Sequence, residues 1–237
     1  MKTKILCIIY DIFEKWNSES VVACRRGCSG CCTQNVTITA VEGEAILRFI
    51  VAENMSLWLG EKLASLRPHQ PPKMTTNDFA SACIEGRGVD PGDHHNLSTC
   101  PFLEKNLCRI YPVRPFGCRL FVSEKTCSAE QPALVSDHYF EAATAVTQLI
   151  EHLGQNEYWG NMLDVLPALL DIGEFREVAD HLSSTHIIHA RLQTLTAKPL
   201  PGFLLSKEST EIVAPLLQSI FAAEVNGKRV EDLLNGN

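Results

Sequence analysis

Cys24-Arg25-Arg26-Gly27-Cys28-Ser29-Gly30-Cys31-Cys32 is a stretch that carries four thiols within nine residues. Spacings of three and two residues let the sulfurs of one turn reach the same metal, since a thiolate site holds each sulfur at about 2.3 Å from the ion. Gly27 and Gly30 favour such a turn because glycine leaves the backbone free. We therefore predict that Cys24, Cys28, Cys31 and Cys32 bind metal, with the adjacent pair Cys31 and Cys32 pointing apart.

A second set of cysteines follows at wider spacing: Cys100, Cys108, Cys118 and Cys127. This set has no second C-x2-C pair, which is the usual mark of a zinc ribbon. Widely separated ligands suit an iron–sulfur cluster at least as well. We expect the two sets to fold onto each other, which would bring eight thiols around an iron–sulfur cluster, with 4Fe-4S favoured, or around zinc.

Composition narrows the class of protein. The chain has 237 residues, of which 45% are hydrophobic, so a substantial core is available. A net charge of −7 argues against a nucleic-acid binder, which needs a basic face. The apolar run after Lys2 and Lys4 is too short for an export signal, and no stretch is long enough for a membrane span. We expect a cytoplasmic protein whose ten cysteines are thiols rather than disulfides, which rarely persist in a reducing compartment.

Arginine is dense around the thiols. Arg114 and Arg119 are predicted to face the centre and to offset the negative charge of its thiolates, whereas Arg25 and Arg26 could equally be solvated. Tyr111 lies between these segments and is a candidate for contact with the centre or a substrate, although a packed aromatic is nearly as good an interpretation.

Together these residues resemble a known family. The pattern Cys-x3-Cys-x2-Cys-Cys, then Cys100-Pro-Phe-Leu, then Cys108-x-Ile-Tyr-x-x-Arg-Pro-x-x-Cys118-Arg, is similar to the YkgJ-type CxxCxxCC proteins of bacteria, which are described as zinc- or iron-chelating. Flagellin lysine N-methylases share this cysteine cluster. The resemblance covers about residues 20–125 and implies metal roles for six cysteines: Cys28, Cys31, Cys32, Cys100, Cys108 and Cys118. Three residues separate Cys24 from Cys28 where the family has two, and Cys127 lies outside the pattern.

The rest of the chain predicts a mainly α protein: an irregular cysteine-rich part over residues 1–133 and a helical part over 134–237. Thr39 and Glu42 have the spacing of a capping box, and a hairpin is expected near Glu104. Further helices are predicted over 136–154 and 157–172 and from a cap at Thr210. The remaining expectations concern isolated side chains: Cys7 and Cys83 buried, and His94 and His95 in a solvated loop.

Three functions stay open. The first is a metal-binding protein with an iron–sulfur or zinc centre. The second is a metal-dependent enzyme that modifies a protein or peptide side chain, as the resemblance to the methylases implies. The third is a structural zinc protein whose helical region binds a partner. The CX3CX2C spacing also occurs in radical enzymes that bind S-adenosylmethionine, but the chain shows few of the strands that their barrel requires.

Overall fold

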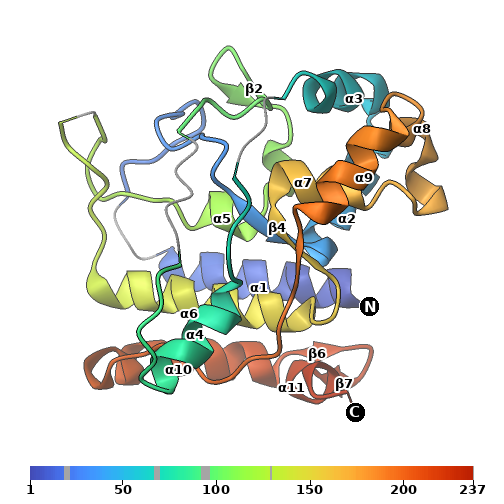
Figure 1. Ribbon diagram of the computed structural model, residues 1–237. Helices are drawn as coiled ribbons and strands as arrows, with labels where there is room; N and C mark the ends of the chain where they lie inside the picture. The colour runs from blue at the N-terminus through green and yellow to red at the C-terminus, as the bar shows by residue number, and fades with distance from the viewer. Residues whose placement is uncertain (19–21, 67–69, 92–96, 129, 237) are drawn as a thin grey trace.

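A computed structural model describes residues 1–18, 22–66, 70–91, 97–128 and 130–236 (Figure 1). The protein is mainly α, as predicted. The helices are α1 (Lys2–Asn17), α2 (Ala40–Ala52), α3 (Ser56–Ala64), α4 (Thr76–Ile84), α5 (Phe116–Arg119), α6 (Asp137–Leu153), α7 (Met162–Ala168), α8 (Arg176–Ala179), α9 (Ser184–Leu192), α10 (Lys207–Ala222) and α11 (Val230–Leu234), with 3-10 turns η1 (Tyr111–Val113) and η2 (Gly173–Phe175). The strands are β1 (Thr37–Thr39), β2 (Leu103–Glu104), β3 (Leu107–Cys108), β4 (Tyr158–Asn161), β5 (Leu195–Thr196), β6 (Glu224–Val225) and β7 (Lys228–Arg229).

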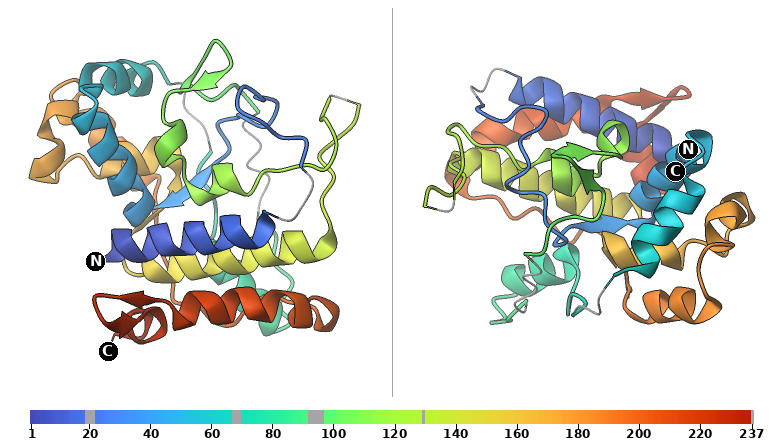
Figure 2. Two further views of the ribbon diagram at one scale, coloured as in Figure 1. Left: turned by 180° about the vertical axis from the view of Figure 1, so that it is seen from behind. Right: turned by 90° about the horizontal axis from the view of Figure 1, so that it is seen from above.

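Three long helices, α1, α6 and α10, lie side by side and form one layer (Figures 1 and 2). Each turns an apolar stripe toward the others, and Ile9, Val146 and Ile220 are fully buried between them. The segments that carry the two predicted sets of metal-binding cysteines lie above this layer in the view of Figure 1. No helix among the described residues is long and apolar enough to cross a membrane.

A second core lies beside the first and is built by α2, α3 and α7. Its buried members include Ile46, Leu59 and Val165 from these helices. Phe102 and Ile110 from the second cysteine segment are also buried in it. The second core therefore anchors the segment that carries Cys100 and Cys108.

A small antiparallel sheet in the order β1-β4-β5 connects the cysteine-rich part to the helical part. Ile38 pairs with Gly160, and Trp159 pairs with both Thr39 and Leu195. The division of the chain into units near residue 133 stays a prediction. The sheet nevertheless places residues from both sides of that point in direct contact.

Several local predictions are confirmed. The Thr39 hydroxyl accepts a hydrogen bond from the Glu42 amide, and the Glu42 carboxylate accepts one from the Thr39 amide, so the capping box is formed. The hairpin β2–β3 has its turn at Lys105 and Asn106, both with positive φ. The helix over 136–154 corresponds to α6, which Ser136 caps.

Other local predictions are wrong. The segment 157–172 is not one helix, because Tyr158–Asn161 pairs as β4 and α7 begins only after the cap at Asn161. Ser206 rather than Thr210 caps α10, and the Thr210 hydroxyl donates to the Ser206 carbonyl inside the first turn. His94 and His95 lie outside the described residues.

Cys7 and Cys83, predicted to be buried, are both exposed. The cores beneath their helices are filled by other residues, such as Ile5 and Leu6 in α1 and Ala80 and Ala82 in α4. All ten cysteines are among the described residues, and none of them forms a disulfide.

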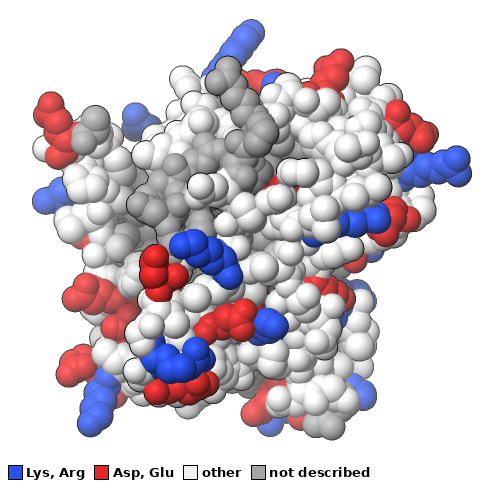
Figure 3. Space-filling model, in the orientation of Figure 1, with Lys and Arg blue, Asp and Glu red and all other residues white. Residues whose placement is uncertain are grey.

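The charged side chains on the face of Figure 3 are interspersed, with Lys and Arg beside Asp and Glu, rather than gathered in a patch of one sign. This distribution agrees with the moderate net charge of −7. Three arginines, Arg25, Arg26 and Arg114, lie instead beside the thiols.

Candidate metal centre

Two cysteine segments far apart in sequence meet along their backbones. The Cys100 amide donates to the Cys32 carbonyl at 2.9 Å, and the Gln34 amide donates to the Ser98 carbonyl at 2.9 Å. Thr33 and Thr99 form a β-bridge between these contacts. The predicted meeting of the two sets is therefore present in the structure.

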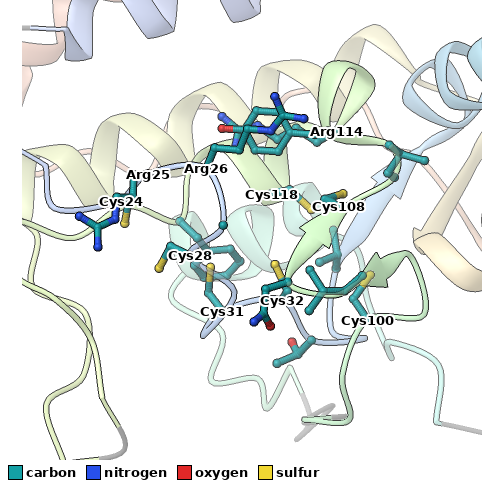
Figure 4. Close-up of a pocket in the computed structure, with 18 of the residues that line it drawn as sticks. Cys24, Arg25, Arg26, Cys28, Cys31, Cys32, Cys100, Cys108, Arg114 and Cys118 are labelled. Carbon is teal, nitrogen blue, oxygen red and sulfur yellow. The ribbon is translucent and has the colours of Figure 1, made fainter.

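The two segments enclose a cavity of about 100 Å³ whose wall carries seven of the eight predicted thiols: Cys24, Cys28, Cys31, Cys32, Cys100, Cys108 and Cys118 (Figure 4). Apolar side chains complete the wall, among them Val36, Ile110 and Met162. The exposed residues Gly27 and Cys28 are also on the wall, so the cavity reaches the protein surface at that side.

Cys100, Cys108 and Cys118 form the inner side of the cavity and pack against the second core. Cys100 precedes β2, Cys108 ends β3 opposite Leu103, and Cys118 lies in α5. Burial raises the pKa of Cys100 to about 11. Burial also raises the pKa of Cys108, and burial with the nearby thiols of Cys100 and Cys108 raises that of Cys118. Without a cation, these thiols are neutral near pH 7.

Cys24, Cys28, Cys31 and Cys32 form the outer side. Figure 4 shows Cys28, Cys31 and Cys32 in a row along this side, so the adjacent pair does not serve separate cavities. The Cys31 thiol donates a hydrogen bond to the Cys32 sulfur, which raises the pKa of Cys31 and lowers the pKa of Cys32. Cys32 thus becomes a thiolate more readily than Cys31.

Cys127 does not lie on the cavity wall. It is exposed, and its sulfur is 3.8 Å from the Lys125 carbonyl. The pKa of Cys24 is raised mainly by burial, and the Cys127 thiol is one of several nearby groups that raise it further. The segment around Cys24 runs beside this region, since the Ala23 amide donates to the Ser123 carbonyl at 2.8 Å. A ligand role for Cys127 stays a prediction.

The thiols surround the cavity without converging on one point. Within the part of the chain that the structure describes, no three side chains of His, Cys, Asp or Glu are placed to hold a single ion. The void has thiols on both sides, and apolar residues and arginines line most of the rest of its wall. A bound metal group of some size would therefore contact several thiols at its periphery.

Two of the three predicted non-cysteine residues, Tyr111 and Arg114, lie on the cavity wall. The Arg114 guanidinium lies 4.3 Å from the centre of the Tyr111 ring. Its positive charge opposes the burial that raises the pKa of Cys108. The third residue, Arg119, lies elsewhere: its guanidinium is 4.5 Å from the centre of the Tyr10 ring and forms an ion pair with Glu14.

Comparison with protein families agrees with this arrangement. Residues 23–139 match the model of the CxxCxxCC family, whose description is "Putative zinc- or iron-chelating domain". The cysteine-rich region is a CxxCxxCC domain. Neither the curated proteins nor the solved structures gave a match to the chain. The matched segment contains all eight cysteines predicted to bind metal and supports metal binding as the general role of this region.

The CxxCxxCC domain also depends on a buried carboxylate that sequence reasoning did not assign to the site. Glu42 accepts hydrogen bonds from the Tyr10 hydroxyl at 2.7 Å and from the Phe116 amide at 2.8 Å, besides those from Thr39. Burial raises the pKa of Glu42, while these hydrogen bonds oppose that shift. Glu42 therefore ties α1 and α2 to the first residue of α5, which carries Cys118. The capping box was visible in the sequence, but its link to Phe116 was not.

Proposed function

We propose that the CxxCxxCC domain holds a cysteine-ligated iron–sulfur cluster, with 4Fe-4S favoured, in the cavity between the two cysteine segments. The observation that supports this best is a void of about 100 Å³ with thiols on both sides. The first candidates for ligands are Cys32, Cys100, Cys108 and Cys118. The three inner thiols are close enough to Cys32 for each of them to raise its pKa. Cys24, Cys28 and Cys31 stand next to them on the outer side.

Zinc is the alternative, and the geometry favours it less. A structural zinc site places four donors at about 2.0–2.3 Å from one point. The described thiols would have to move inward to form such a site, because no three of them converge on a single ion. A cluster is itself several ångströms across and takes its thiolate ligands at its corners. A ring of sulfurs around a void is the arrangement that such a group needs.

The surroundings of the cavity suit a negatively charged cluster. Thiolates on a cluster carry net negative charge, and Arg114 on the cavity wall supplies a positive charge close to Cys108 and Cys118. The apolar wall limits contact with water, which is one of the factors that set the reduction potential of a cluster. Ligand thiols must remain reduced before the metal binds, so we place the protein in a reducing compartment, the cytoplasm.

The test is the metal and sulfide content of anaerobically purified protein, together with its visible absorption. Bound iron and sulfide with a broad absorption that oxidation bleaches would support a cluster. Colourless protein with one zinc per chain would contradict it. Cys118→Ser is expected to lose the metal, since Cys118 lies on the inner wall. Cys83→Ser is the matched control, because Cys83 is an exposed thiol on α4 and should leave metal content unchanged. Equal metal loss in both variants would contradict the assignment of the cavity.

A metal-dependent enzyme that modifies a protein or peptide side chain is a second candidate. The observation that favours it is the open side of the cavity at Gly27 and Cys28, since a purely structural metal is usually enclosed. A substrate could approach the centre from there. If this is correct, a small water-soluble chelator should strip metal from the folded protein within minutes. Removal only upon unfolding would indicate a closed, structural centre instead.

A further inference from the structure

Three arginines at the cavity have no carboxylate partner among the residues that the structure describes. Arg25, Arg26 and Arg114 all lie on the wall of the cavity. Within the described ranges, none of their guanidinium groups forms an ion pair with a carboxylate. Other arginines do pair, as Arg48 does with Glu174 and Arg191 with Asp171. In a chain of net charge −7, three arginines without a carboxylate partner among the described residues thus lie around one opening.

Arg26 and Arg114 are organised by the ring between them. The Arg114 guanidinium is 4.3 Å and the Arg26 guanidinium 6.0 Å from the centre of the Tyr111 ring. Figure 4 shows Arg26 and Arg114 together at one edge of the cavity, whereas Arg25 extends past Cys24, away from them. Contact with an aromatic ring restrains a guanidinium while its N–H groups stay free to donate. The pair is therefore held ready for a ligand with paired acceptor oxygens.

The two arginines, Arg26 and Arg114, differ in the groups with which they already interact. Arg114 is half-buried and interacts electrostatically with Cys31, Cys108 and Cys118. Its charge is therefore shared with the thiols and with any metal group that they bind. Arg26 is exposed, and its guanidinium lies over the Tyr111 ring. An incoming anion would rely mainly on Arg26, with Arg114 fixing the ring and adding a weaker attraction.

We propose that Arg26, Tyr111 and Arg114 form a binding site for a carboxylate at the mouth of the cavity. The carboxylate would accept two hydrogen bonds from the Arg26 fork, which matches the planar spacing of its two oxygens. The organic part of the ligand would lie against the Tyr111 ring and toward apolar wall residues such as Leu103. The site is made entirely of side chains of this chain, and none of the three is a proposed metal ligand.

The first experiment measures binding by calorimetry to the protein as purified. The probes are glutarate as a small organic acid, a short peptide with one glutamate side chain, and inorganic phosphate. Binding of either carboxylate more tightly than phosphate supports the site, and the tighter of the two identifies the source as a free acid or a peptide. Phosphate binding without carboxylate binding, or no binding by either carboxylate probe, overturns the proposal.

Variants locate the site. Arg26→Ala is expected to weaken carboxylate binding at least tenfold, because it removes a charge-assisted pair of hydrogen bonds. Arg26→Lys should recover only part of the affinity, since lysine keeps the charge but loses the fork. Arg25→Ala is the matched control, with the same charge change one residue away, and should change binding less than twofold. If Arg25→Ala weakens binding as much as Arg26→Ala, the attraction is a diffuse charge effect and the site is wrong.

Metal content measured on the same samples keeps this proposal separate from the proposed function. Arg26→Ala should retain all of its metal, because Arg26 is exposed and is not a ligand. Protein without metal that still binds carboxylate would leave the site standing while the metal proposal fails. Protein that has its full metal content but binds no carboxylate would leave the metal proposal standing while the carboxylate site fails.

Discussion

The inner thiols Cys100, Cys108 and Cys118 are fixed by the fold, whereas the outer thiols Cys24, Cys28 and Cys31 lie on a loop. The inner segment is anchored by Phe102 and Ile110, both buried in the second core, and by the hairpin β2–β3. The outer loop is held mostly by its own turns, such as the hydrogen bond from the Cys28 amide to the Arg25 carbonyl at 2.9 Å. One side of the cavity is therefore preformed, and we expect the other side to settle when metal binds.

The largest effect is expected when a thiol of the preformed side is removed and compared with a thiol that lies off the cavity wall. Cys108→Ser, on the preformed side, should lower metal affinity at least tenfold, because a hydroxyl is a poor ligand for a thiophilic metal. Cys127→Ser, off the cavity wall, should leave affinity within about twofold. Competition with a chelator of known affinity measures both. Greater loss with Cys127→Ser would mean that the metal recruits this exposed thiol and depends less on the preformed side.

The preformed side should also depend on Glu42. Glu42→Ala removes the acceptor for Tyr10, Thr39 and Phe116 and leaves buried donors unsatisfied, which should lower the free energy of unfolding by about 3 kcal/mol or more. Tyr10→Phe deletes only one hydroxyl of the same network and should cost about 1 kcal/mol. Urea denaturation of the metal-free proteins gives both values. Equal, small losses would show that α5 and its Cys118 are held by packing alone.

Raising the pH should weaken the preformed side. Burial raises the pKa of Cys100 to about 11 from an ordinary value of 9.0. The unfolded chain therefore loses this proton first, so the stability contributed by the neutral thiol is complete below pH 9 and is lost as the pH rises toward 11. Metal-free protein should denature at lower urea at about pH 10 than at about pH 8. Cys100→Ala should reduce that slope, whereas Cys83→Ala, which alters an exposed thiol, should not.

The smallest effect is expected from the hydrogen bond that joins the outer loop to the hairpin turn. The Ser29 hydroxyl donates to the Asn106 side chain at 3.2 Å, which joins the loop to the hairpin turn at an exposed position. Ser29→Ala should leave the free energy of unfolding within about 0.5 kcal/mol, and should lower metal affinity only a few-fold. Hydrogen exchange of amides 22–32 in the metal-free protein provides a direct measurement. Faster exchange in Ser29→Ala that is limited to this loop would agree with an outer loop that becomes ordered only when metal binds.

Local signals in the sequence predicted some features well. The capping box at Thr39 and Glu42 and the hairpin at Glu104 depend on neighbours within four residues, so their chemistry is visible in the sequence. The meeting of the two cysteine sets, which the structure shows in the contact of Cys32 with Cys100, was predicted from thiol chemistry rather than from local pattern.

Features that depend on distant partners were not predictable in the same way. The segment Tyr158–Asn161 is a strand because β1 and β5 flank it, and no helical or strand period of its own decides that. Arg119 follows Cys118 directly, yet α5 turns it toward Tyr10 and Glu14 instead of the cavity. The exposure of Cys7 reflects which face of α1 meets α6 and α10, which the helix periodicity alone left open.

The contact between Val36 and Met162 has a consequence for how the protein is made. The Met162 amide donates to the Val36 carbonyl at 2.8 Å, and both side chains line the cavity. When synthesis has reached residue 127, the nascent chain contains every predicted ligand. It still lacks Met162, which forms part of the cavity wall. We therefore expect the nascent chain to acquire its metal late, after residue 162 has emerged, so that cellular metal-insertion machinery would meet a nearly finished polypeptide.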